Sequence, residues 1–197
     1  MVTSKVHPEE EPASPGVKSG SIIPADNVTE AEKRQHAVMF RLLYPFFRLK
    51  WSIRRATIPN VFMNILAGKI KATLIAENEH CIVLRDLHSV SENHLLVIPR
   101  KKIESWKECS PEDLDLLRAM KDTAMEALTS LGVAEEARAL GFMTPPYNTQ
   151  YQLHLHALER PVTATGLRGS AFDLDYSPIF KSMDYVQEQV AKKKART

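Results

Sequence analysis

Residues 151–158 alternate polar and apolar side chains, and this pattern constrains the fold more than any other part of the sequence. The segment reads Tyr-Gln-Leu-His-Leu-His-Ala-Leu. On a β-strand, side chains two residues apart lie on the same face. The pattern therefore predicts a strand with Gln152, His154 and His156 on one face, and with its two imidazoles roughly 7 Å apart. A single histidine on a strand is usually only an outward-facing polar residue, so further evidence is needed before a site is inferred.

That evidence is a second predicted strand that opens on a histidine. Residues 93–103 read Asn-His-Leu-Leu-Val-Ile-Pro-Arg-Lys-Lys-Ile, so His94 is followed by an apolar run and then a basic turn. Two histidine-bearing strands in one chain favour a shared site over coincidence.

Together the two segments resemble the histidine triad superfamily of nucleotide hydrolases and transferases. Its signature is His-x-His-x-His followed by two apolar residues, with an upstream strand of the form His-x-Leu-Val-Ile-Pro-Lys-Lys-His-Ile. The resemblance covers residues 60–161, and the stretch Gly-Phe-Met-Thr-Pro-Pro-Tyr at 141–147 resembles the Hint-related branch. One position departs from the signature, because Gln152 stands where the first triad histidine belongs.

The resemblance implies a catalytic role for three histidines. His154 matches the middle triad histidine, the nucleophile that forms a covalent nucleotidyl intermediate in the family. Neutral imidazole suits this chemistry, because it is a good nucleophile near neutral pH. His156 matches the third triad position, a donor toward phosphate oxygens, and His94 matches the upstream histidine that borders the same site.

Gln152 leaves two alternatives open. An amide can donate and accept hydrogen bonds but cannot carry a proton in catalysis. If the first triad position only orients its neighbours, activity survives the replacement, which is the interpretation we favour. If it supplies charge to the transition state, turnover slows by roughly 10²-fold or more.

The resemblance also implies nucleotide-binding residues. Asp86 matches the carboxylate that binds the ribose hydroxyls in relatives, and Asn148 and Thr149 match polar residues that touch the α-phosphate. Without the resemblance, these three residues would be ordinary turn and loop residues. Ile65 and Leu84 approximate positions that line the base pocket.

Composition narrows the remaining choices. The chain has 26 basic and 24 acidic residues, a balance that gives no indication of a nucleic-acid-binding protein. Its two cysteines, Cys81 and Cys109, form no Cys-x-x-Cys motif, so we predict neither a structural metal nor a cofactor. Metal binding by His154 and His156 is the less favoured alternative. The chain starts without a signal-like apolar run, so we expect a cytoplasmic location, with the nucleus also possible.

Four segments follow from the pattern. Residues 1–27 are rich in Pro, Ser and Glu and are predicted to be a disordered tail. Residues 28–59 are predicted to form an amphipathic helical extension with a kink or restart at Pro45. Residues 60–161 form the predicted domain. Residues 162–197 are predicted to be a loop followed by a helix and a basic tail.

Within the domain, short strands joined by turns and one long helix starting at Ser110 indicate an antiparallel α+β fold. The resemblance adds a five-stranded sheet and a homodimer in which two sheets join. The segment 46–55 mixes apolar and basic residues. It fits a membrane or partner surface, or an accessory helix packed on the domain, and the second interpretation is favoured.

Two functions from different classes fit this sequence. The first is hydrolysis of purine nucleoside phosphoramidates, in which AMP is linked to an amine, without a metal; dinucleoside polyphosphates and adenylylated substrates are rival substrates. The second is a nucleotide-binding or scaffold protein with a weakened triad.

Overall fold

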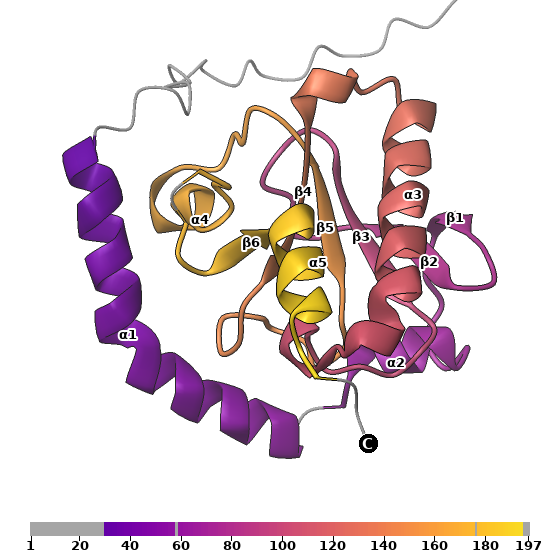
Figure 1. Cartoon of the computed structure of the whole chain (residues 1–197), viewed down its shortest axis with the longest axis horizontal. Helices are drawn as coiled ribbons and strands as arrows, with labels where there is room; N and C mark the ends of the chain where they lie inside the picture. Colours follow the sequence, from indigo (N-terminus) through magenta and orange to yellow (C-terminus); the bar gives the residue numbers. More distant parts are fainter. Residues whose placement is uncertain (1–29, 58, 176, 195–197) are drawn as a thin grey trace, which may run out of the picture.

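A computed structural model describes residues 30–57, 59–175 and 177–194, so the predicted tail at 1–27 lies outside the described residues. The helices are α1 (Glu30–Thr57), α2 (Val61–Leu66), α3 (Leu114–Ser130), α4 (Gly166–Ala171) and α5 (Met183–Ala191). The strands are β1 (Leu74–Glu77), β2 (Cys81–Arg85), β3 (His94–Pro99), β4 (Arg138–Met143), β5 (Leu155–Glu159) and β6 (Phe180–Ser182). Figure 1 shows the sheet at the centre of the molecule, with α1 along its outside.

The strands form one antiparallel sheet in the order β1-β2-β3-β5-β4-β6. The predicted α+β class is confirmed, but the sheet has six strands where five were expected. The sixth, β6, pairs with β4 so that Gly141 lies opposite Ser182 and Met143 opposite Phe180. The outer strands of the sheet are therefore β1 and β6. The predicted homodimer stays a prediction, and a second sheet could join this one only at β1 or β6.

The histidine strand is shorter than its sequence pattern indicates. We expected a strand over residues 151–158, but β5 begins at Leu155. Its pairing with β3 ends where Val97 meets Leu155, and β3 itself ends at Pro99. Beyond this point, Leu153 donates its backbone N–H to the carbonyl of Ile103 instead of continuing the ladder. The alternation of polar and apolar residues in the sequence therefore extends over residues 151–154, beyond the end of the hydrogen-bond ladder between β3 and β5.

One face of the sheet carries the main core. Figure 1 shows α3 and α5 side by side against this face. Leu117, Met120 and Leu128 of α3 are fully buried there. The cap predicted at Ser110 is present, because the Asp113 carboxylate accepts the backbone N–H of Ser110 at 2.9 Å. It begins a 3-10 turn at Pro111–Asp113, and the α-helix itself starts only at Leu114. Such a cap satisfies a donor that the first helical turn leaves free.

The opposite face carries the histidines. His94 and Leu96 of β3 alternate with core-facing residues, and His156 of β5 lies opposite Leu96. Helix α2 packs on this face through Phe62, and its first turn is capped by the side chain of Asn60. Our prediction of a simple loop after residue 161 is wrong, because this segment forms α4 and β6 before α5 begins.

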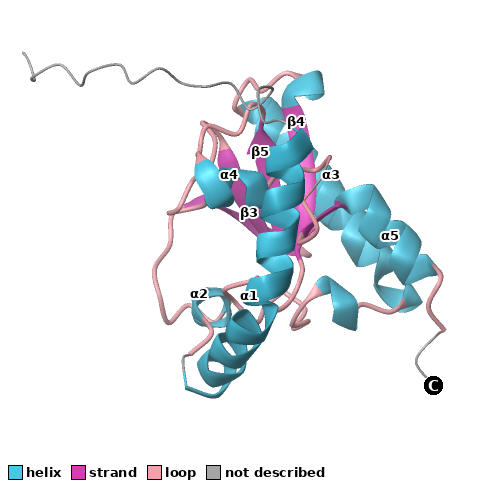
Figure 2. Ribbon diagram, turned by 90° about the vertical axis from the view of Figure 1, so that its left-hand side faces the viewer, coloured by secondary structure: helices cyan, strands magenta, loops and turns pink. Residues whose placement is uncertain are grey.

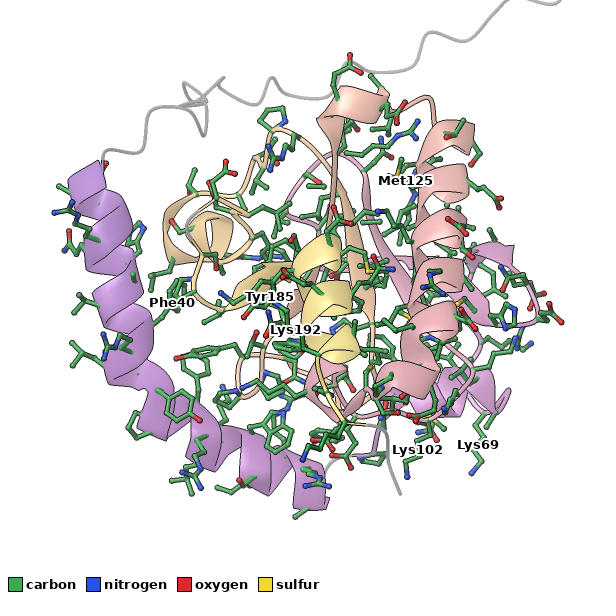
Figure 3. The ribbon with its side chains drawn as sticks, viewed as in Figure 1. Phe40, Lys69, Lys102, Met125, Tyr185 and Lys192 are labelled. Atoms are coloured by element: carbon green, nitrogen blue, oxygen red, sulfur yellow. The ribbon has the colours of Figure 1, made fainter. Side chains whose placement is uncertain are left out.

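Helix α1 continues through Pro45 without a break in its assignment. Figure 1 shows that it curves around the domain, which agrees with the predicted kink and not with a restart. Phe40 points from α1 toward the domain and is only 6% exposed (Figure 3). No helix among the described residues is long and apolar enough to cross a membrane.

Candidate active site

Three side chains from neighbouring elements meet on the α2 side of the sheet. The Nε2 atom of His94 lies 2.9 Å from Nδ1 of His156 and 3.3 Å from Oδ2 of Asp86. His94 opens β3, His156 lies in β5, and Asp86 follows β2, so the order of these three strands brings the side chains together. The structure thus joins residues that are up to 70 positions apart in the chain.

His154 lies beside this cluster, with its ring centroid 5.0 Å from that of His156. Its Nδ1 atom is 2.7 Å from the backbone carbonyl oxygen of Gln152. A carbonyl oxygen can only accept, so Nδ1 carries the proton and donates it in this bond. Nε2 of His154 is therefore left with a free lone pair, the form that a nucleophile needs.

The same reasoning fixes the protons of the other two histidines. The backbone N–H of Val90 donates to Nδ1 of His94 at 3.3 Å, so His94 carries its proton on Nε2. That proton points at the Nδ1 atom of His156, while Oδ2 of Asp86 lies 3.3 Å from the same nitrogen. His156 consequently carries its own proton on Nε2, which is buried and has no hydrogen-bond partner among the described residues. A buried donor without a partner is rare and marks a position where a ligand oxygen would bind.

Burial keeps all three imidazoles neutral. It lowers the pKa of His94 from 6.5 to about 4, against the opposing effect of the Asp86 carboxylate. Burial also lowers the pKa of His154, which the Gln152 carbonyl and Asp86 partly counteract. The pKa of His156 lies well below its ordinary value because of burial and the neighbouring histidines. Taking a charge out of water explains the common direction of these shifts.

The Gln152 amide is bonded through its nitrogen only, since its Oε1 atom is buried and has no partner among the described residues. Its Nε2 atom donates to the carbonyls of Pro99 and Lys101, at 3.0 and 2.8 Å, and its side chain is fully buried. These bonds tie the triad segment to the end of β3. The group that sets the tautomer of His154 is the backbone carbonyl of residue 152, which is present whatever side chain that residue carries.

The two loop residues predicted to bind nucleotide differ in position. Asn148 is buried and its Nδ2 atom donates to the carbonyl of Gln150, while its Oδ1 atom has no partner in the described part of the chain. Asn148 lines a cavity of about 10 Å³ together with Gln152 and His154. Thr149 is exposed on the same loop. The structure therefore brings Asn148, but not the side chain of Thr149, to the inside of the site.

Aromatic residues that sequence reasoning missed surround the histidines. Phe62 of α2 meets the His154 ring edge-on at 5.2 Å, and Phe172 lies 5.4 Å from His94 and 5.0 Å from His156. Phe180 of β6 lies 5.9 Å from His156. Phe172 and Phe180 come from the segment after residue 161, and no local pattern in the sequence marks them as neighbours of His156.

The ligand atoms of Asp86, His94 and His156 all lie within 4.8 Å of one another, close enough to hold a metal ion. Two imidazoles and a carboxylate suit zinc. In the arrangement described here, a hydrogen bond joins the two histidines and the Asp86 carboxylate lies 3.3 Å from His94. We therefore derive the chemistry of the site from the hydrogen-bonded form, and the predicted absence of a metal stays a prediction.

Known proteins with similar sequences carry related names. The chain is 35% identical over 100 residues to adenosine 5'-monophosphoramidase HINT3 of Danio rerio, covering 50% of this chain and 62% of that protein. The match thus spans less than two thirds of this relative. The HINT3 protein of Mus musculus is 27% identical over 135 residues, covering 67% and 81% of the two chains.

Solved structures show the same fold. A HIT family hydrolase from Legionella pneumophila superposes with a TM-score of 0.50 at 27% identity, covering 54% of this chain and 96% of that one. A HIT family hydrolase from Clostridium thermocellum gives a TM-score of 0.50 at 24% identity, over 55% and 96% of the two chains, and supports the fold alone.

The family model described as "Scavenger mRNA decapping enzyme C-term binding" matches residues 59–170, which include Asp86 and all the histidines of the cluster. This match spans more than half of the chain and agrees with the fold, the histidine strands and the named relatives. The protein therefore belongs to this family, within the histidine triad superfamily.

Proposed function

We propose that this protein hydrolyses adenosine phosphoramidates, in which AMP is linked through phosphorus to an amine, by way of a covalent intermediate on His154. One observation carries the proposal. The Gln152 carbonyl holds the proton of His154 on Nδ1, so the neutral Nε2 atom is free to attack phosphorus. The replacement of the first triad histidine by Gln152 leaves this arrangement intact.

In the first step, Nε2 of His154 forms a bond to the α-phosphorus while the phosphorus–nitrogen bond breaks. The electron pair of the broken bond leaves with the amine, which takes up a proton from solvent. In the second step, a water oxygen bonds to phosphorus and the bond to His154 breaks, which returns the electron pair to the imidazole. The water gives up a proton, and AMP is released.

His156 would stabilise the phosphoryl oxygens in both steps. Its Nε2–H is buried and has no partner among the described residues, so it is available to donate to a phosphoryl oxygen. A donor held in place before the reaction stabilises developing charge without the cost of reorganisation. His94 would hold His156 in this tautomer through the 2.9 Å bond to its Nδ1 atom.

The nucleoside would bind along the same face of the sheet. Asp86 is partly exposed at the edge of the cluster, where its carboxylate could accept the ribose hydroxyls. Ile65 and Leu84 belong to one apolar cluster with Phe62, and Phe62 contacts the His154 ring. This cluster offers apolar side chains against which a purine could stack.

The leaving group is less constrained than the nucleotide. The HINT3 relatives are named as monophosphoramidases, which favours an amine. A protein of Arabidopsis thaliana, 26% identical over 127 residues, is named as a bifunctional adenosine 5'-phosphosulfate phosphorylase/adenylylsulfatase, which indicates sulfate. That match covers 64% of this chain and 77% of that protein. Adenosine 5'-phosphosulfate should therefore be assayed beside the phosphoramidate.

The test is turnover of a fluorogenic adenosine phosphoramidate by the purified chain in the presence of a chelator. The proposal predicts turnover that is lost in His154→Ala and kept in His88→Gln, a control at an exposed histidine outside the cluster. Trapping by acid quench followed by mass spectrometry should find AMP attached to the wild type and not to His154→Ala. Turnover by His154→Ala equal to that of wild type would exclude the covalent mechanism.

A nucleotide-binding protein without turnover is the second candidate. It is favoured by the position of the Gln152 amide, which is engaged by two backbone carbonyls and supplies no acid to the site. If AMP raised the melting temperature of wild type and His154→Ala equally, and neither protein turned over any substrate, this second function would hold.

A further inference from the structure

Helix α1 has two apolar faces, of which only one is covered. The inner face contacts the domain through Phe40 and Phe47, whose rings lie 5.8 and 4.9 Å from that of Tyr147. Trp51 adds an edge-on contact with Tyr151 at 6.2 Å. These contacts hold α1 against the loop that leads to the triad, so the opposite face of the helix is turned outward.

The outer face carries a continuous apolar stripe. Its residues are spaced by four, four, three and four positions, which places them on one side of a helix. They are 54% to 75% exposed and are Val38, Leu42, Phe46, Leu49 and Ile53. The stripe is roughly 20 Å long at the rise of an α-helix. Figure 2 views the molecule from this side and shows α1 in the foreground.

Basic residues border this stripe, and acidic residues are absent from it. Residues 37–57 contain five basic side chains and no acidic one. Arg34, Arg41 and Arg48 recur every seventh position, follow one flank of the stripe and are exposed. Arg55, the next in this row, is instead ion-paired with Glu104 of the domain at 2.7 Å. Lys50 lies on the other flank. A shallow depression of about 330 Å³ combines Arg48 with Leu49 and Ser52.

We propose that this face of α1 binds the surface of a lipid bilayer that contains anionic phospholipids. The apolar stripe would enter the boundary between headgroups and acyl chains, and Arg41 and Arg48 would pair with lipid phosphates. The depression at Arg48 offers a cation and a hydroxyl beside an apolar side chain, a combination that suits a phosphate headgroup. Pro45, which bends the helix toward the domain, turns this face outward along its length.

Charge decides against a second copy of the chain as the occupant. Two α1 helices packed along their stripes would bring together Arg41, Arg48 and Lys50 of both copies, and residues 37–57 contain no acidic residue to pair with them. Like charges along such an interface are destabilising. An anionic bilayer supplies the missing negative charge wherever the basic side chains lie along the helix.

The experiment is sedimentation of the full chain with vesicles of phosphatidylcholine alone or with about one third phosphatidylserine. We expect binding to the anionic vesicles that weakens with added salt. Two variants should each bind the anionic vesicles at least about tenfold more weakly than wild type. They are the triple variant Leu42→Gln/Phe46→Gln/Leu49→Gln and the double variant Arg41→Gln/Arg48→Gln.

Matched controls change the same chemistry elsewhere. Ile70→Gln/Leu74→Gln/Leu87→Gln removes three exposed apolar side chains that are not on α1. Lys69→Gln/Lys102→Gln removes two exposed cations, both labelled in Figure 3. Both controls should bind like wild type, and all variants should keep the wild-type melting temperature, because the altered side chains are exposed.

Three results would overturn the proposal. One is equal sedimentation with neutral and anionic vesicles, or none with either. Another is unchanged binding by both α1 variants. The third is a dimer of the wild type, seen by sedimentation equilibrium, that the triple variant abolishes, because the stripe would then be an interface between copies of the chain.

Discussion

The backbone carbonyl oxygen of Gln152 accepts a hydrogen bond from Nδ1 of His154 at 2.7 Å. This carbonyl would orient the nucleophile of the proposed reaction, and it belongs to the backbone, so it is present whatever side chain stands at position 152. The side chain of Gln152 has a separate structural task, because it bonds to two carbonyls at the end of β3. The orientation of His154 by this carbonyl is therefore independent of the hydrogen bonds that the side chain of residue 152 makes.

This independence predicts how substitutions at position 152 behave. Gln152→His should change the turnover of an adenosine phosphoramidate by less than about tenfold. An added imidazole accelerates turnover by more than this only when it transfers a proton or stabilises charge in the reaction. Gln152→Glu should lower the free energy of unfolding by roughly 1–3 kcal/mol or more, because a carboxylate oxygen would face the carbonyls of Pro99 and Lys101. Steady-state kinetics and urea unfolding measure the two effects. A gain of a hundredfold or more in Gln152→His would show that the missing imidazole carried charge in catalysis.

Removal of the Nε2–H donor of His156 should lower the turnover of substrate more than it lowers the affinity for AMP. His156→Phe keeps a ring among Phe172 and Phe180 but removes the Nε2–H, so kcat should fall by roughly 10²- to 10³-fold. His156→Gln restores a donor and should recover part of this loss. The affinity for AMP, measured by calorimetry, should change less than kcat in both variants. An unchanged kcat in His156→Phe would exclude this donor from the reaction.

The buried histidines predict a stability that depends on pH. The folded pKa of His94 is about 4, below its ordinary value of 6.5, so between these values the unfolded chain binds more protons than the folded one. The free energy of unfolding should therefore be fully retained above about pH 6.5 and should fall as the pH is lowered toward 4. Urea unfolding across this range measures the slope. His94→Asn should reduce the slope, whereas His88→Gln, at an exposed histidine, should leave it unchanged.

The contact between β4 and β6 predicts that residue 141 must stay small. A Cβ atom on Gly141 would lie 2.6 Å from Phe180 Cζ and 2.8 Å from the carbonyl oxygen of Lys181. Gly141→Ala should therefore lower the free energy of unfolding by roughly 1–3 kcal/mol, the usual cost of overpacking. Phe180→Leu combined with Gly141→Ala should show a favourable coupling, because the smaller side chain relieves part of the overlap. Additive effects in a double-mutant cycle would contradict this explanation.

Local sequence determined the elements and the histidine strands. Alternation predicted strands at the two histidine segments, and the residues from Ser110 predicted the cap that precedes α3, because each signal depends on neighbours within a few positions. The pattern also placed His94 and His156 on strands. It overestimated the strand at 151–158, because hydrogen-bond pairing depends on where the partner strand β3 ends, and that information lies about 50 positions upstream.

Tertiary structure alone decided how these groups work together. The tautomer of His154 depends on a backbone carbonyl, which every residue type carries and which no sequence pattern can single out. The neutral state of the histidines depends on burial by side chains from α2, β6 and the segment after α4. The addition of β6 to the edge of β4 required a chain reversal of about 40 residues, for which three strand residues give almost no local signal. Likewise, the sequence placed apolar and basic residues on α1, but only the packing of Phe40, Phe47 and Trp51 determined which face is left exposed.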